Sequence, residues 1–94
     1  MIDVIVTLQI KPGMEAAAEE ILRQLESETT ENDKGCLRYQ WYRAEHAGTY
    51  YLLERWFNQA ALDEHFKATH MAKLLPQIAE CAVEFKTIRL TRLE

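Results

Sequence analysis

The segment from Glu54 to Met71 places side chains capable of proton transfer in a stretch that is patterned like a protein core. Its candidates for catalysis are Glu54, His65 and His70, which stand among apolar and aromatic residues. Burial removes hydration from an imidazole, which lowers its pKa and leaves a neutral ring that accepts a proton near pH 7. The pattern therefore predicts acid–base chemistry, and the alternative is a core histidine hydrogen-bonded to the backbone.

The two histidines are expected near the junction of two helices. His65 shares a helical stripe with Leu62 and Phe66, so its ring is predicted to point at the sheet. His70 follows five residues later, a separation that rotates it by about 140° on one continuous helix, so a single helix would not present both rings to one metal ion. A helix break at Thr69 would turn both rings inward, and the alternative for His70 is a surface position near a cap. No metal site is predicted.

Glu54 shares a strand face with Leu52 and Trp56. A carboxylate with apolar neighbours either pairs with an arginine or has its pKa raised. Leu52, Trp56 and Phe66 are predicted to wall a flat apolar pocket that suits an aromatic ligand, and ordinary core packing is the alternative for them. The arginines available to pair with Glu54 are Arg38, Arg43 and Arg55.

Charge and hydropathy limit the partners and the location. The 94 residues include 11 basic and 15 acidic side chains, a net charge of −4, without a dense Lys/Arg cluster. This balance argues against nucleic acid and anionic membranes as partners. No apolar run approaches the roughly 20 residues of a membrane span, and the start of the chain lacks a signal-peptide pattern. A single domain over residues 1–94 in the cytoplasm is expected.

Motifs for the commoner cofactors and nucleophiles are missing. Cys36 and Cys81 have no CxxC spacing and are expected to be reduced core thiols. The three glycines are isolated, so the sequence contains neither a phosphate loop nor a Rossmann turn. It also lacks a nucleophile elbow and an HExxH motif, and His46 in a hairpin loop receives no role. No cofactor is predicted.

Hydrophobic periodicity predicts the order strand, helix, strand, strand, helices, strand. An apolar helical stripe runs from Met14 to Leu25 and precedes a polar segment at residues 27–34. A short glycine-containing loop between the two middle strands is typical of an antiparallel hairpin. The expected strands span residues 2–10, 36–43, 49–57 and 82–93.

The later helices carry their own boundary signals. Asn58 is a good cap for a helix that begins at Gln59, and Thr69 resembles a second cap. Pro76 is expected to kink or restart the second of these helices. In the final strand the apolar parity changes between Phe85 and Ile88, which predicts either a bulge or burial on both faces.

With right-handed crossovers this order predicts an α+β, ferredoxin-like βαββαβ fold with a four-stranded antiparallel sheet. Tyr39 and Trp41 fall on one sheet face, and Tyr42 and Tyr51 fall on the other, so both faces are partly apolar. Because the helices can cover only one face, the second is predicted to meet a copy of itself. A homodimer through the sheet faces is expected.

Several short motifs resemble those of the antibiotic biosynthesis monooxygenase family, particularly its quinol monooxygenase branch. They are Glu54-Arg55-Trp56, Ala60-Ala61-Leu62, His65 and Thr69-His70-Met71. The similarity extends from the first strand and Lys11-Pro12-Gly13, through Gly35-Cys36, to the last strand. The resemblance implies a ferredoxin-like protomer whose sheet packs against a second protomer's sheet to form a dimeric α+β barrel.

The resemblance also implies cofactor-free oxidation of a quinol or polyphenol-like aromatic by dioxygen. An electron-rich phenolate or quinol anion can pass an electron to dioxygen, so the protein has to deprotonate, orient and shield its substrate. His65 is the implied proton acceptor, with His70 or Glu54 as its partner and Trp56 and Phe66 as pocket walls.

Other activities in the same family set the alternatives. Haem-degrading members have an asparagine, a tryptophan and a haem-ligating histidine at the positions that correspond to Val6, His65 and Leu75 in this chain. Haem degradation is therefore not expected. Other relatives are isomerases of small phosphorylated carbonyl compounds, and scattered arginines would have to hold the phosphate here. A non-catalytic dimeric barrel that binds an apolar ligand is the third alternative.

Overall fold

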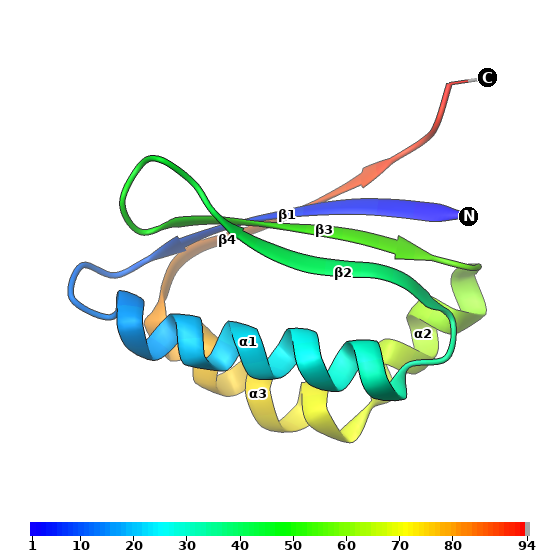
Figure 1. Cartoon of the computed structure of the whole chain (residues 1–94), viewed down its shortest axis with the longest axis horizontal. Helices are drawn as coiled ribbons and strands as arrows, with labels where there is room; N and C mark the ends of the chain where they lie inside the picture. Colours follow the sequence, from blue (N-terminus) through cyan, green and yellow to red (C-terminus); the bar gives the residue numbers. More distant parts are fainter. Residues whose placement is uncertain (94) are drawn as a thin grey trace.

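The computed structural model describes residues 1–93 of the chain as one antiparallel sheet with its helices on one side. The strands lie in the order β2-β3-β1-β4, and Figure 1 shows all the labelled helices beneath one face of this sheet. This is the ferredoxin-like α+β plan predicted from the sequence. The elements in chain order are β1 (Ile2–Ile10), α1 (Glu15–Asn32), β2 (Cys36–Arg43), β3 (Thr49–Trp56), α2 (Gln59–Lys67), α3 (Thr69–Cys81) and β4 (Ala82–Leu90).

β1 supplies the centre of the core. It pairs with β3 on one side and with β4 on the other, so its length is enclosed within the sheet. Its side chains alternate in burial, and those that face the helices are at most 8% exposed. Burial of each such aliphatic side chain contributes roughly 1.5–3 kcal/mol, which makes β1 the anchor of the face that carries the site. The buried set is Ile2, Val4, Val6, Leu8 and Ile10.

α1 is longer than predicted, because the polar segment at residues 27–34 continues the helix as far as Asn32. The buried stripe of Ala18, Leu22 and Leu25 ends in Thr29, which is fully buried. Because threonine is polar, the sequence pattern does not show that Thr29 continues the buried stripe, and the final turns of the helix were therefore not predicted. Their formation places the residues after Asn32 beside α2 and α3.

A break at Ala68 separates α2 from α3. The Asn58 side chain caps α2 by accepting the Ala61 backbone N–H at 2.9 Å, as predicted. Ala68 has an extended backbone and precedes α3 directly, so the predicted cap at Thr69 is wrong by one residue. α3 continues through Pro76, so the helix does not restart there; the proline removes one hydrogen bond from its middle.

β3 and β4 end earlier than predicted, at Trp56 and Leu90. The register irregularity lies near the start of β4, opposite Gln9 and Ile10 of β1. Pairing is regular from Phe85 to Ile88, so the predicted bulge between these residues is wrong. The parity change instead reflects apolar side chains on both faces of β4, where Phe85 is 46% and Ile88 49% exposed.

The sheet face opposite the helices carries a partly apolar surface, as predicted. Tyr42, Tyr51, Ile88 and Leu90 stand on this outer face and are between 40% and 49% exposed. Figure 1 shows the outer face bare of helices. Within residues 1–93, no helix combines the length and the apolar character needed to cross a membrane.

Gly35 allows α2 to pack closely against the turn before β2. A Cβ atom at this position would overlap the Cβ of Ala61 in α2. The Gly35 carbonyl also accepts the Phe57 backbone N–H at 2.8 Å, so the backbone is tied at this point. Since α2 carries His65, the absence of a side chain at Gly35 sets how close that histidine comes to the end of α1.

We expect Gly35→Ala to lower the free energy of unfolding by about 1–3 kcal/mol through overpacking. Urea denaturation followed by circular dichroism would measure this. The double variant Gly35→Ala/Ala61→Gly moves the methyl group from Ala61 to position 35 and so removes the overlap. It should be more stable than Gly35→Ala, although a glycine in a helix costs up to about 1 kcal/mol relative to alanine. A Gly35→Ala protein as stable as the original chain would contradict this account.

Candidate functional site

A cavity of about 330 Å³ lies between the sheet and helices α2 and α3; we call it the inner cavity. Much of its wall is aliphatic, including Leu52, Met71 and Ile78. Glu54 and His65 bring titratable groups into the same wall. A largely apolar cavity of this size with a few polar groups is typical of a small-molecule site.

Glu54 reaches the inner cavity from the sheet. It stands in a row across the strands between Tyr39 of β2 and Val4 of β1. Its Oε1 accepts a hydrogen bond from Nε1 of Trp56 at 3.0 Å. Burial raises the pKa of the Glu54 carboxyl, and the Trp56 N–H opposes this only in part. The carboxyl therefore keeps its proton more readily than one in water.

An arginine partner for Glu54 is not found within residues 1–93, so the second of the two predicted outcomes, a raised pKa, applies. Each arginine considered as a partner for Glu54 donates to another side chain instead. Arg55 donates to Asp3 at 2.6 Å, Arg43 donates to Glu19 at 2.8 Å and Arg38 donates to Gln40 at 2.8 Å.

His65 reaches the inner cavity from α2, and its ring is 1% exposed. The ring centroid lies 4.5 Å from Trp56 and 5.4 Å from both Tyr39 and Phe66. Burial lowers the pKa of His65, while the hydrogen bond and the charge of Asp33 raise it in part. The inward direction predicted for this ring is confirmed, and its neutral form is favoured.

Asp33, which sequence reasoning did not identify, contacts both histidines. It is the C-terminal cap of α1, and Nδ1 of His65 donates to its Oδ2 at 2.5 Å. The same Oδ2 lies 3.4 Å from Nε2 of His70. In the sequence Asp33 is one of several acids around the end of a helix, and its role depends on a contact 32 residues away. No periodicity marks such a partner.

His70 is also turned inward, as the predicted helix break required. It is 7% exposed, and its Nε2 lies 3.0 Å from Oγ1 of the buried Thr29. The centroids of the two histidine rings are 5.9 Å apart. His70 faces a second depression of about 860 Å³ on the helical side, the outer groove, which Asp33 and His65 also line. His65 therefore stands in the wall between the inner cavity and the outer groove.

The structure brings most of the predicted site residues to the inner cavity. Leu52, Glu54, His65 and Phe66 line it. Trp56 is fully buried behind Glu54 and His65, where it contacts both side chains. Phe66 was expected on the inward stripe of α2, but it is 61% exposed at the border of the cavity, because α2 places only Leu62 and His65 fully inside.

Asp33, His65 and His70 offer two nitrogens and one oxygen, all within 4.8 Å of one another, a donor set that divalent metals accept. Ligand atoms about 2.1 Å from an ion and 90–109° apart are separated by roughly 3.0–3.4 Å. The His65 and Asp33 atoms are only 2.5 Å apart. The arrangement is that of a hydrogen-bonded network.

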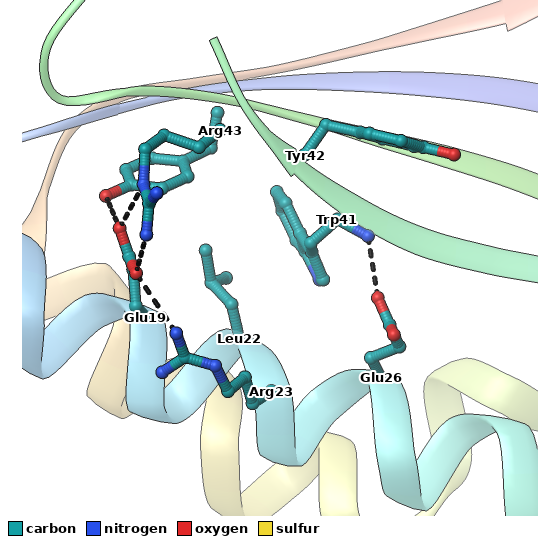
Figure 2. A pocket seen from close by; sticks show the side chains of 8 residues that line it. Glu19, Leu22, Arg23, Glu26, Trp41, Tyr42 and Arg43 are labelled. Atoms are coloured by element: carbon teal, nitrogen blue, oxygen red, sulfur yellow. Dashed lines mark hydrogen bonds and ion pairs between the residues drawn. The ribbon is translucent and has the colours of Figure 1, made fainter.

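A further pocket of about 340 Å³ lies between α1 and β2; its charged side chains have partners, whereas Nε1 of the Trp41 ring is buried without one among residues 1–93. Figure 2 shows Glu19 paired with Arg43 and Arg23. The Tyr50 hydroxyl also donates to Glu19, and Glu26 accepts the Trp41 backbone N–H at 2.8 Å. The contact with Arg43, followed by that with Tyr50, lowers the pKa of Glu19 to about 2. These contacts fix α1 under β2 and thereby position the end of α1.

The fold agrees with what comparisons with known proteins find. The model of the antibiotic biosynthesis monooxygenase family matches residues 1–76. The chain belongs to this family. The matched residues include Asp33, Glu54, His65 and His70, whereas β4, which brings Arg89 to the inner cavity, follows the matched region.

Solved structures of similar proteins superpose on almost the whole chain. A crystal structure of an antibiotic biosynthesis monooxygenase is 26% identical, covers 100% of both chains and has a TM-score of 0.92. A Pseudomonas aeruginosa protein is 28% identical over 99% of this chain and 94% of its own, with a TM-score of 0.90. A Mycobacterium tuberculosis protein is 26% identical over 99% and 95%, with a TM-score of 0.89. No curated protein matches the sequence significantly.

We expect Glu54→Gln to be more stable than the original chain at about pH 8, because glutamine keeps an acceptor for Trp56 and removes a buried charge. Below the ordinary value of 4.5 the carboxyl is protonated in both the folded and unfolded states, so the difference should vanish. It should grow as the pH rises through the raised pKa of the folded state. Urea denaturation at several pH values would measure this.

Glu20→Gln, on the exposed side of α1, is the matched control and should show no such growth with pH. If the original chain is the more stable one at pH 8, the environment stabilises the Glu54 carboxylate, and the proposed neutral form is wrong.

Proposed function

We propose that this chain is a cofactor-independent monooxygenase of the quinol-monooxygenase-like branch, which oxidises a quinol or polyphenol-like aromatic with dioxygen. The observation that carries the proposal is the buried His65 ring, favoured in its neutral form, in the wall of a largely apolar cavity. Such a ring is a general base at a place from which bulk water is displaced when an aromatic ligand binds.

The substrate supplies its own reducing power in this reaction. His65 takes the proton of a ring hydroxyl on Nε2, since Nδ1 is engaged by Asp33. The resulting anion transfers electrons to dioxygen, and one oxygen atom is inserted into a ring C–H bond as a hydroxyl group. The ring hydroxyls of the quinol become carbonyls, and the other oxygen atom leaves as water. Atoms and electrons balance without a further reductant.

Glu54 complements His65 because burial acts on both groups. Burial favours the uncharged form of each, so the carboxyl tends to keep a proton while the imidazole tends to lack one. A protonated Glu54 donates a hydrogen bond to a developing carbonyl oxygen, whereas His65 accepts a proton. Leu52 and Phe66 line the cavity in which the ring would lie.

We expect His65→Gln to lower oxygen uptake with a responsive naphthoquinol by about 10²–10⁴-fold, the usual contribution of a general base. An oxygen electrode and a panel of naphthoquinols would measure the rate above autoxidation. His46→Gln, in the exposed hairpin loop, is the matched control and should keep the original rate. The proposal fails if no quinol gives uptake above autoxidation, and the role of His65 fails if His65→Gln is as active as the original chain.

A second candidate function has one specific observation in its favour. Arg89 of β4 lines the inner cavity, two strands away from Glu54 on the same face. A guanidinium there would suit a phosphate, so an isomerase of a small phosphorylated carbonyl compound is the alternative. Proton exchange of such a substrate with solvent deuterium, without oxygen consumption, would favour it. Saturable binding without either reaction would favour a ligand-binding barrel.

The active form in this proposal is a cytoplasmic homodimer in which residues 1–94 of each copy act as one domain. Its basis is the partly apolar outer face of the sheet, which a second copy would cover to give an α+β barrel. The free thiols of Cys36 and Cys81 fit a reducing compartment.

We expect sedimentation at micromolar concentration to give about twice the 11.0 kDa of one chain. Tyr51→Glu places a charge on the outer face and should shift the protein toward the monomer. Ala72→Glu adds the same charge on the exposed side of α3 and should leave the mass unchanged. A monomeric original chain would contradict the proposed dimer.

A further inference from the structure

Asp33 stands beside the wall between the inner cavity and the outer groove, and the proposed function assigns it no role. Asp33 lines the outer groove, and its side chain is 10% exposed. His65, which lines both cavities, is the point where the two meet. Asp33 therefore approaches the base from the side opposite the proposed substrate.

The contact between Asp33 and His65 determines where the imidazole carries its proton. A carboxylate only accepts hydrogen bonds, so the 2.5 Å contact requires the proton on Nδ1 of His65. A neutral ring with a proton on Nδ1 has its lone pair on Nε2. The opposite tautomer would leave Nε2 protonated and unable to take a proton from a ligand.

Asp33 is itself held in place. Its backbone N–H donates to the Thr29 carbonyl at 3.0 Å, and its own carbonyl accepts the Cys36 N–H at 3.0 Å. The buried pair of Thr29 and His70 lies beside its carboxylate, with His70 3.4 Å away. These contacts tie the end of α1 to the start of β2 and leave the carboxylate little freedom to turn from His65.

We infer that Asp33 is a positioning residue of the site: it fixes the His65 tautomer that leaves Nε2 open toward the inner cavity, and it stabilises the imidazolium formed when Nε2 accepts a proton. The catalytic half of this inference rests on the proposed function, whereas the tautomer is a property of the protein alone. Asp33 acts through His65 and does not touch the cavity that would hold the substrate.

Other charged and titratable groups also face His65, and the effect of Asp33 has to be separated from theirs. Burial lowers the pKa of His65, and His70 acts in the same direction, whereas Asp33 raises it. Removal of the Asp33 charge should therefore lower the pKa of His65 further. The other titratable and charged groups near the ring are Tyr39 on β2, Glu54 on β3, Arg89 on β4, His70 on α3 and, along the outer groove, Glu28, Lys34, Glu64, Lys67 and Lys73.

Long-range ¹H–¹⁵N spectra of the histidine-labelled protein test the tautomer without any substrate. We expect His65 of the original chain to carry its proton on Nδ1. In Asp33→Asn the pKa of His65 should fall, and both tautomers should be populated, because an amide can donate as well as accept. Asp63→Asn removes a charge from the exposed side of α2 and should leave both properties unchanged. A proton on Nε2 in the original chain would overturn the inference even if Asp33→Asn did not fold.

Oxygen uptake tests the catalytic half. Asp33→Asn should lower kcat by about tenfold or more with little change in KM. The acid limb of the pH profile of kcat should move to lower pH, because the pKa of His65 falls. Asp33→Glu should recover part of the rate, which loss of folding alone would not explain. If the original chain is active and Asp33→Asn keeps its rate and pH profile, Asp33 has no such role. If no quinol is oxidised but the tautomer is as expected, the proposed function fails and the positioning by Asp33 stands.

Discussion

A buried imidazole, whose neutral form is favoured, is held inside an apolar layer, and most of the local structure follows from this constraint. The His65 ring lies on Trp56, and its one polar contact within residues 1–93 is with Asp33. A buried imidazole without a partner would carry the cost of an unsatisfied donor, so the end of α1 has to reach α2. The extra turns of α1 and the missing side chain at Gly35 make this approach sterically feasible.

The same desolvation shifts the pKa values of two groups in one cavity. Because charged forms are disfavoured in an apolar wall, a carboxyl and an imidazole both shift toward neutrality, which means opposite shifts in pKa. Glu54 and His65 come from different layers, one from the sheet and one from the helices, and they meet at the inner cavity. The layered fold thus shifts the pKa values of Glu54 and His65 in opposite directions without an ion pair between them.

Polar contacts outside the cavity set the positions of these layers. Glu19 and Glu26 bind β2 and the side chains near it, which fixes α1 along the sheet. Asn58 begins α2, and the extended Ala68 ends it, so His65 and His70 project from two helices toward one point. A continuous helix would have separated the rings by their rotation about its axis. The site is therefore a product of helix boundaries as much as of side-chain types.

The sequence alone determined the fold class, the order of the elements and the inward faces of His65 and Glu54, because alternation and helical stripes record which side of an element is buried. The family came from the resemblance of its short motifs. It missed the last turns of α1, where the buried position is held by Thr29, and it misplaced a helix cap at Thr69. Only the tertiary structure decided that Asp33, and not His70 or Glu54, is the hydrogen-bond partner of His65. Hydrogen bonds between residues far apart leave no period in a sequence, and their choice depends on how closely the layers pack.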